Sequence, residues 1–120
     1  MVWDSQYYAG EGIAAKKEKI KWKILHRAGL IDVYVIALSS NPKNLLDIIP
    51  SWELNQKCYP KEGMVVVGID KGYENAMELA GRIVMDVYRD TGGFNVRDYF
   101  KGRQKDNKNR PQPFSRFRAR

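Results

Sequence analysis

Residues 64–93, MVVVGIDKGYENAMELAGRIVMDVYRDTGG, carry the clearest fold signal in the chain. Residues 64–69 are a continuous apolar run rich in β-branched side chains, which predicts a buried strand. From residue 73 to residue 90 the apolar positions recur at helical spacing. Gly92 or Gly93 then supplies the left-handed residue that commonly ends a helix. A strand followed directly by an amphipathic helix indicates an α/β domain.

A second buried strand is predicted upstream, at Val33–Leu38. After it, Asn41 is a good helix N-cap and Pro42 suits the first helical position, so we expect a helix through Leu45 and Ile49. Pro50 would bend or end that helix. Two strands joined by such a helix form a right-handed βαβ unit.

Residues 19–24 alternate strictly between lysine and the apolar residues Ile20, Trp22 and Ile24. This period of two favours a third strand, with lysines on its outer face. A helix over residues 11–28 competes with it, because alanine and lysine are good helix formers.

The predicted fold is therefore α/β, with a small three-stranded sheet, parallel or mixed, in the order β-β-α-β-α. Residues 1–12 read as a loose N-terminal arm, because glycines at 10 and 12 interrupt any regular element. Residues 13–100 form the single domain. Residues 101–120 are predicted as a disordered basic tail, since their composition cannot bury enough apolar area to offset the ordering entropy.

The positive charge is concentrated in that tail. The chain has 21 Lys and Arg against 14 Asp and Glu, and residues 101–120 contain eight of the bases and one acid. The first 100 residues are therefore neutral. Spaced bases on a flexible segment neutralise phosphates without reading sequence. The predicted nucleic-acid-binding residues are Lys101, Arg103, Lys105, Lys108, Arg110, Arg116, Arg118 and Arg120.

A candidate anion site follows from the predicted βαβ unit. The carboxyl ends of parallel strands meet at one edge of a sheet, and helix N-termini there favour anions. This edge would bring together Ser39, Ser40 and Asn41 with Asp70, Lys71 and Gly72. The same residue types also serve as ordinary helix caps and turn residues.

Other site chemistry has little support. His26 and Cys58 are the only histidine and cysteine, too few for a tetrahedral metal site, and no cofactor or catalytic motif is found. With one cysteine and no apolar span or secretory leader, we expect a reducing compartment, the cytoplasm.

The sequence therefore predicts a non-enzymatic binding protein that contacts nucleic acid through its basic arm. The alternative is a protein–protein assembly module, such as a homodimer, anchored by Trp3, Trp52 and Tyr99, whose tail solubilises it or binds an acidic partner. An enzyme or anion-binding site at the Ser39/Asp70 edge is the third hypothesis.

Overall fold

The computed structural model describes residues 1–120 except 27–29, 31, 40, 42–43, 57–62 and 110–120. The elements in chain order are β1 (Val2–Ala9), the 3₁₀ turn η1 (Ala14–Lys16), α1 (Lys17–Leu25), β2 (Val33–Leu38), β3 (Leu46–Pro50), α2 (Ser51–Leu54), β4 (Val65–Lys71), α3 (Tyr73–Thr91) and α4 (Val96–Asn109). The α/β class is confirmed, and β2, β4 and α3 lie where the sequence predicts them.

The described sheet has four strands, in the order β1-β4-β2-β3. The β4 strand is parallel to β1 and antiparallel to β2, and β3 is antiparallel to β2, so the sheet is mixed. The prediction of three strands is wrong, because residues 2–9 form β1 rather than a loose arm, residues 46–50 form β3, and residues 19–24 form no strand. The aromatic residues of β1 suit a strand, and its irregular register begins where the Gln6 amide donates to the Asp4 carboxylate.

The predicted βαβ unit is also wrong. The segment after β2 returns as a strand, because Leu46, Ile48 and Ile49 pair with β2 instead of forming a helical face. The Asn41 carbonyl accepts from the Asn44 amide in a turn, so Asn41 does not begin a long helix. Pro50 is tolerated because β3 is an edge strand, where a missing N–H breaks no second ladder.

The lysine-rich segment at 19–24 is a helix, contrary to the favoured strand. In α1, Ile20 and Ile24 are four residues apart and share one face, and Ile24 is buried. Trp22 lies away from that face and is 56% exposed. The helix buries Ile24, partly buries Ile20 and leaves the tryptophan outside, which the strict alternation did not indicate.

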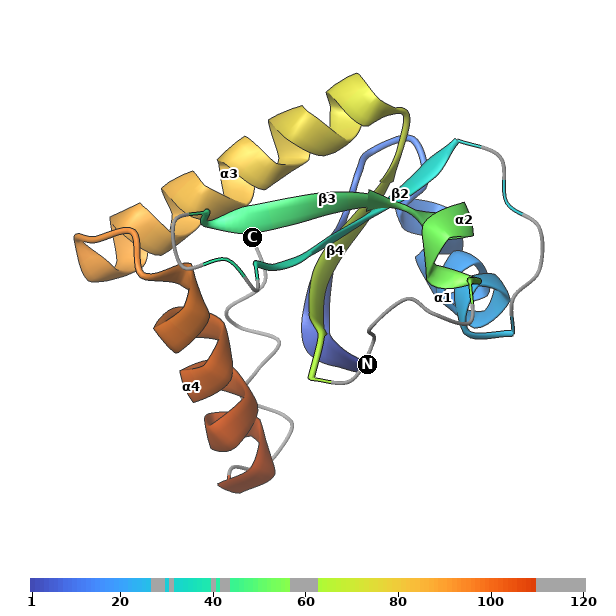
Figure 1. Ribbon diagram of the computed structural model, residues 1–120. Helices are drawn as coiled ribbons and strands as arrows, with labels where there is room; N and C mark the ends of the chain where they lie inside the picture. The colour runs from blue at the N-terminus through green and yellow to red at the C-terminus, as the bar shows by residue number, and fades with distance from the viewer. Residues whose placement is uncertain (27–29, 31, 40, 42–43, 57–62, 110–120) are drawn as a thin grey trace.

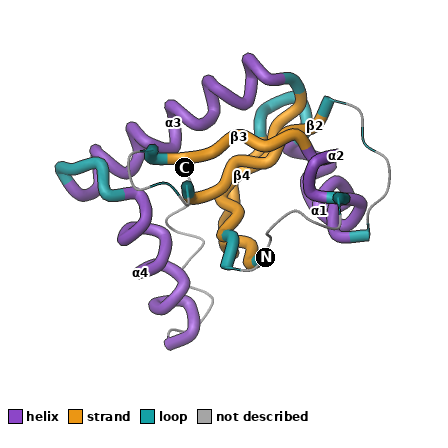
Figure 2. The backbone as a smooth tube through the Cα atoms, in the orientation of Figure 1, coloured by secondary structure: helices purple, strands orange, loops and turns teal. Residues whose placement is uncertain are grey.

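The sheet lies between two layers of helices (Figures 1 and 2). On one face, Ile24 of α1 and Leu54 of α2 pack against alternate side chains of the strands, Val35 among them. On the other face, Ile36 packs under α3 and the beginning of α4. Val35 and Ile36 are both fully buried, so neighbouring residues of β2 supply the two halves of the core.

The C-terminal end of α3 follows the predicted pattern. Gly92 is left-handed, with φ 78° and ψ 7°, and its amide donates to the Tyr88 carbonyl. The chain then turns back and buries Val96 and Phe100. Residues 101–109 were predicted as disordered tail, whereas α4 continues to Asn109. Lysine, arginine and glutamine are good helix formers, and the buried Phe100 anchors the turns before them. Residues 110–120 lie outside the described part of the chain.

Candidate functional sites

The structure does not bring the two halves of the predicted anion site together. Because β2 and β4 are antiparallel, Asp70 pairs with Tyr34 at the beginning of β2, whereas Ser39 follows the other end. Ser39 is buried; its hydroxyl accepts from the Asn41 amide and its carbonyl accepts from the Arg97 guanidinium. Ser39 and Asn41 thus serve a local turn. Ser40 lies outside the described residues.

The other half of the predicted anion site, Asp70–Gly72, does line a pocket. Residues 10–12, which the sequence predicts as the end of a loose N-terminal arm, line the same pocket. The parallel strands β1 and β4 end side by side, and the Gly10 amide donates to the Ile69 carbonyl there. The cavity has a volume of about 580 Å³. Its polar and glycine lining residues include Gly10, Glu11, Gly12, Asp32, Asp70, Lys71, Gly72, Asn75, Glu78 and Arg82. We call it the strand-end pocket.

Asp70 is the buried polar group of this pocket. It is 6% exposed, and its Oδ1 accepts from the Lys71 amide at 2.7 Å. Gly72, with φ 83°, precedes α3, and its amide donates to the Asp32 carbonyl. No described side chain caps the first turn of α3. Four carboxylates and two cationic side chains line the cavity, so its charge opposes the anion that the sequence analysis placed at these residues.

A different, strongly basic surface covers α1. Residues 16–23 contain five lysines and one acid, Glu18. The Tyr7 hydroxyl donates to the Glu18 carboxylate at 2.6 Å. Burial, reinforced by this hydrogen bond, raises the pKa of Tyr7 above its usual range, so the phenol remains a donor. The one acid among residues 16–23 thereby accepts a hydrogen bond from β1, and five lysines against this single carboxylate leave the segment strongly positive.

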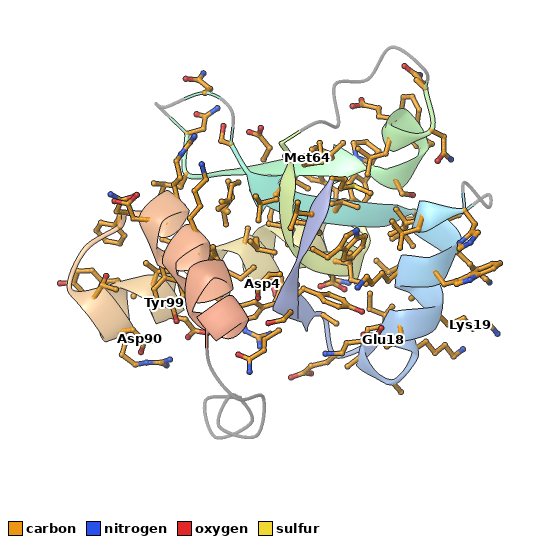
Figure 3. All side chains as sticks on the ribbon, turned by 90° about the horizontal axis from the view of Figure 1, so that it is seen from below. Asp4, Glu18, Lys19, Met64, Asp90 and Tyr99 are labelled. Atoms are coloured by element: carbon orange, nitrogen blue, oxygen red, sulfur yellow. The ribbon has the colours of Figure 1, made fainter. Side chains whose placement is uncertain are left out.

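The lysines of residues 16–23 differ in their surroundings. The Lys17 ammonium lies 5.0 Å from the centroid of the Tyr7 ring, and that of Lys21 lies 5.3 Å from the Trp3 ring. These two are held against β1 by cation–π contacts. Lys16 and Lys19 are exposed, and Figure 3 shows Lys19 extending away from the body.

Trp22 lies among these lysines and is itself exposed. Its indole stacks on the His26 ring, with centroids 3.9 Å apart and planes inclined by 19°. The His26 Nδ1 lies 2.8 Å from the Trp22 carbonyl oxygen, which fixes the imidazole beside the indole. Trp22 and His26 thus form an exposed, orientated aromatic pair on a lysine-rich surface.

The predicted nucleic-acid-binding residues fall partly within the structure. Lys101 is an exposed residue of α4, and Arg103, Lys105 and Lys108 belong to the same helix. Arg110, Arg116, Arg118 and Arg120 lie outside the described residues. In Figure 3, α4 and α1 lie on either side of β1, so both basic helices border one edge of the sheet.

Of the aromatic anchors predicted for a protein interface, Trp52 is 56% exposed. Trp3 is half-buried and packs edge-on against Tyr7, and the Tyr99 hydroxyl donates to Asp90. These three side chains come from different elements, and the structure gives them separate surroundings rather than one shared patch.

Two classes of site have no counterpart in the described residues. No group of three His, Cys, Asp or Glu side chains there is arranged to hold a metal ion. No helix in that part of the chain has both the length and the apolar character of a membrane span. Comparison of the chain with protein-family models, with curated proteins and with solved structures finds no match.

Proposed function

We propose that the chain binds nucleic acid through its phosphates, without sequence preference, using the lysines of α1 together with the bases of α4 and of residues 110–120. The observation that carries the proposal is the composition of residues 16–23: five lysines and a single acid, Glu18, which accepts a hydrogen bond from Tyr7. A surface of this kind releases condensed counterions from the nucleic acid when it binds.

Trp22 supports single strands as the preferred form. Proteins that bind single strands combine basic surface with aromatic side chains on which bases stack. Trp22 is 56% exposed and already orientated by His26. A duplex keeps its bases stacked on one another and can use only the lysines. The proposal therefore predicts tighter binding of a single strand than of a duplex of equal length.

The test is fluorescence anisotropy with labelled oligonucleotides, single-stranded and duplex, over a range of salt concentrations. Affinity should fall linearly with salt on a double-logarithmic plot. Lys19→Glu should weaken binding at low salt and reduce the slope by about one unit, as expected for a lost phosphate contact. Lys71→Glu makes the same charge change at an exposed residue of the strand-end pocket, outside α1, and is the matched control.

Trp22→Ala tests the stacking. It should lower single-strand affinity by roughly 1–3 kcal/mol and duplex affinity much less. Removing residues 110–120 measures the share of the C-terminal bases without cutting α4. Equal effects of Lys19→Glu and Lys71→Glu would contradict a specific role of α1. Binding to acidic lipid vesicles in the absence of any binding to DNA or RNA would overturn the proposal.

A further inference from the structure

The strand-end pocket contains a buried acid with one unpaired oxygen. Asp70 is 6% exposed and lines the cavity. Its Oδ1 accepts a hydrogen bond from the Lys71 amide, whereas its Oδ2 has no hydrogen-bonding or ionic partner among the described residues. A buried carboxylate is unfavourable unless a cation or further donors accompany it. Asp70 therefore presents to the cavity an anionic oxygen that a ligand can complete.

The other charged groups of the pocket are exposed and do not pair with one another. They are three acids and two bases: Glu11, Asp32, Glu78, Lys71 and Arg82. Within the described part of the chain none of these side chains forms an ion pair, although Glu78 and Arg82 are four residues apart on α3. With Asp70 included, the acids outnumber the bases by two to one, so the cavity attracts a cation.

The lining of the pocket decides which kind of cation fits. No group of three His, Cys, Asp or Glu side chains in the described residues is arranged to hold a metal ion. The apolar side chains of the lining are the aliphatic Ile13 and Leu79, and no aromatic side chain of the described residues lines the cavity. The pocket thus offers carboxylates to ammonium groups and an aliphatic surface to an alkyl chain, but no ring on which an aromatic ligand would stack.

The cavity extends along the first half of α3. Its lining residues from this helix recur at helical spacing and share one face: Asn75, Glu78, Leu79 and Arg82. Over that distance the helix rises by about 10 Å. The Asn75 Nδ2 donates to the Lys71 carbonyl, so its Oδ1 remains a further acceptor. A row of this length fits an elongated ligand, and the cavity volume of about 580 Å³ is sufficient for one.

We propose that the strand-end pocket binds a short linear aliphatic diamine. One ammonium group donates to the Asp70 Oδ2, and the alkyl chain lies along Leu79 so that the second ammonium group reaches Glu78. The contact with Asp70 is a charge-assisted hydrogen bond to a buried acceptor and contributes most of the affinity. Arg82 repels a further ammonium group beyond Glu78, which favours a diamine over a longer polyamine.

An amide NMR titration with putrescine, without nucleic acid, tests the site and its position. The amide signals of Gly10, Gly72 and Asn75 should shift in a saturable manner, and those of α1 should not. n-Butylamine has the same alkyl chain but one ammonium group, and should bind about threefold more weakly. Mg²⁺ has the charge of putrescine and should not reproduce these shifts at equal ionic strength. Equal responses to putrescine and Mg²⁺, or no response to millimolar putrescine, would overturn the proposal.

Matched substitutions test the residues. Asp70→Asn should weaken putrescine binding roughly tenfold or more, because it removes the buried charge. Glu78→Gln should weaken it about threefold, as expected for an exposed ion pair. Glu74→Gln makes the same change at an exposed residue of α3 outside the pocket lining, and should have no effect. Equal effects of Glu78→Gln and Glu74→Gln would contradict the site, and this pair decides even if Asp70→Asn fails to fold.

This site is independent of the nucleic-acid surface on α1. Lys19→Glu, which should weaken nucleic-acid binding, should leave putrescine binding unchanged, because Lys19 does not line the pocket. Loss of putrescine binding in Lys19→Glu would contradict a separate site. Failure of either proposal in its own assay leaves the other standing.

Discussion

Gly10 and Asp70 touch where β1 and β4 end side by side. A Cβ added to Gly10 would lie 2.0 Å from the Asp70 Oδ1, closer than any real contact. Asp70 is almost fully buried and accepts a hydrogen bond from the Lys71 amide, so its carboxylate has little freedom to turn aside. The close approach of the two strand ends therefore requires a glycine at position 10.

We predict that Gly10→Ala destabilises the fold by roughly 1–3 kcal/mol, the usual effect of overpacking. Gly12→Ala is the control, because no described atom lies within 4 Å of that Cβ position; it should change stability by less than about 0.5 kcal/mol. Urea unfolding measures both. Adding Asp70→Ala to Gly10→Ala should cost less than the sum of the single changes, and strict additivity would contradict the proposed clash.

Local sequence signals predicted the position of Asp70 in the fold, but not its contact with Gly10. The buried run before Asp70 and the helix after Gly72 place Asp70–Gly72 at a strand end, as the structure confirms. The contact of Gly10 with Asp70 joins residues sixty positions apart and depends on the direction of β1. No local propensity determines that direction, and local patterns alone predict that Asp70 lies beside Ser39 instead.

At the scale of elements, α1 shows why an alternating pattern is ambiguous. Ile20 and Ile24 share a face both in a strand, at even spacing, and in a helix, at a spacing of four. Trp22 distinguishes the two, since it accompanies the isoleucines only in the strand. The structure leaves Trp22 exposed beside His26 and buries Ile24. Whether residues 19–24 form a strand or a helix depends on which of their side chains the sheet can cover, which is a property of the whole fold.

The end of α3 is an element whose boundary the sequence does predict. Gly92 is left-handed and donates to the Tyr88 carbonyl, whereas Gly93 has no positive φ. We predict that Gly92→Val lowers the free energy of unfolding by roughly 1–2 kcal/mol, because a branched side chain strains this conformation. Gly93→Val should have a clearly smaller effect in the same urea melts. Equal losses of unfolding free energy in the two variants would contradict the special conformational requirement at Gly92.

At the scale of the molecule, hydrophobic patterning predicted the α/β class and charge composition the basic C-terminal region, but neither predicted the topology. The segment after β2 could return as a helix or as a strand, and Leu46–Pro50 contains residues compatible with both. Pairing with β2 decides in favour of the strand and makes β2 and β4 antiparallel. That single change separates Ser39 from Asp70 and moves the pocket to the ends of β1 and β4.

The parallel pairing of β1 with β4 has a consequence for the order of folding. Between the two strands lie 55 residues, against 7 between β2 and β3. By loop-closure entropy alone, the longer connection costs about 2 kcal/mol more to close. We therefore expect β2, β3, β4 and α3 to assemble first and β1 to dock afterwards.

Native-state hydrogen exchange in low denaturant can measure this order. The Val2 amide, bonded to the Met64 carbonyl, and the Gly10 amide, bonded to the Ile69 carbonyl, should open at a lower free energy than the amides that join β2 to β4. Equal protection of the amides from exchange across the whole sheet would contradict this order of folding. In this order of folding, β1 leaves the ribosome before the other described strands but pairs last. Its aromatic side chains therefore remain exposed to solvent until β4 has been synthesised.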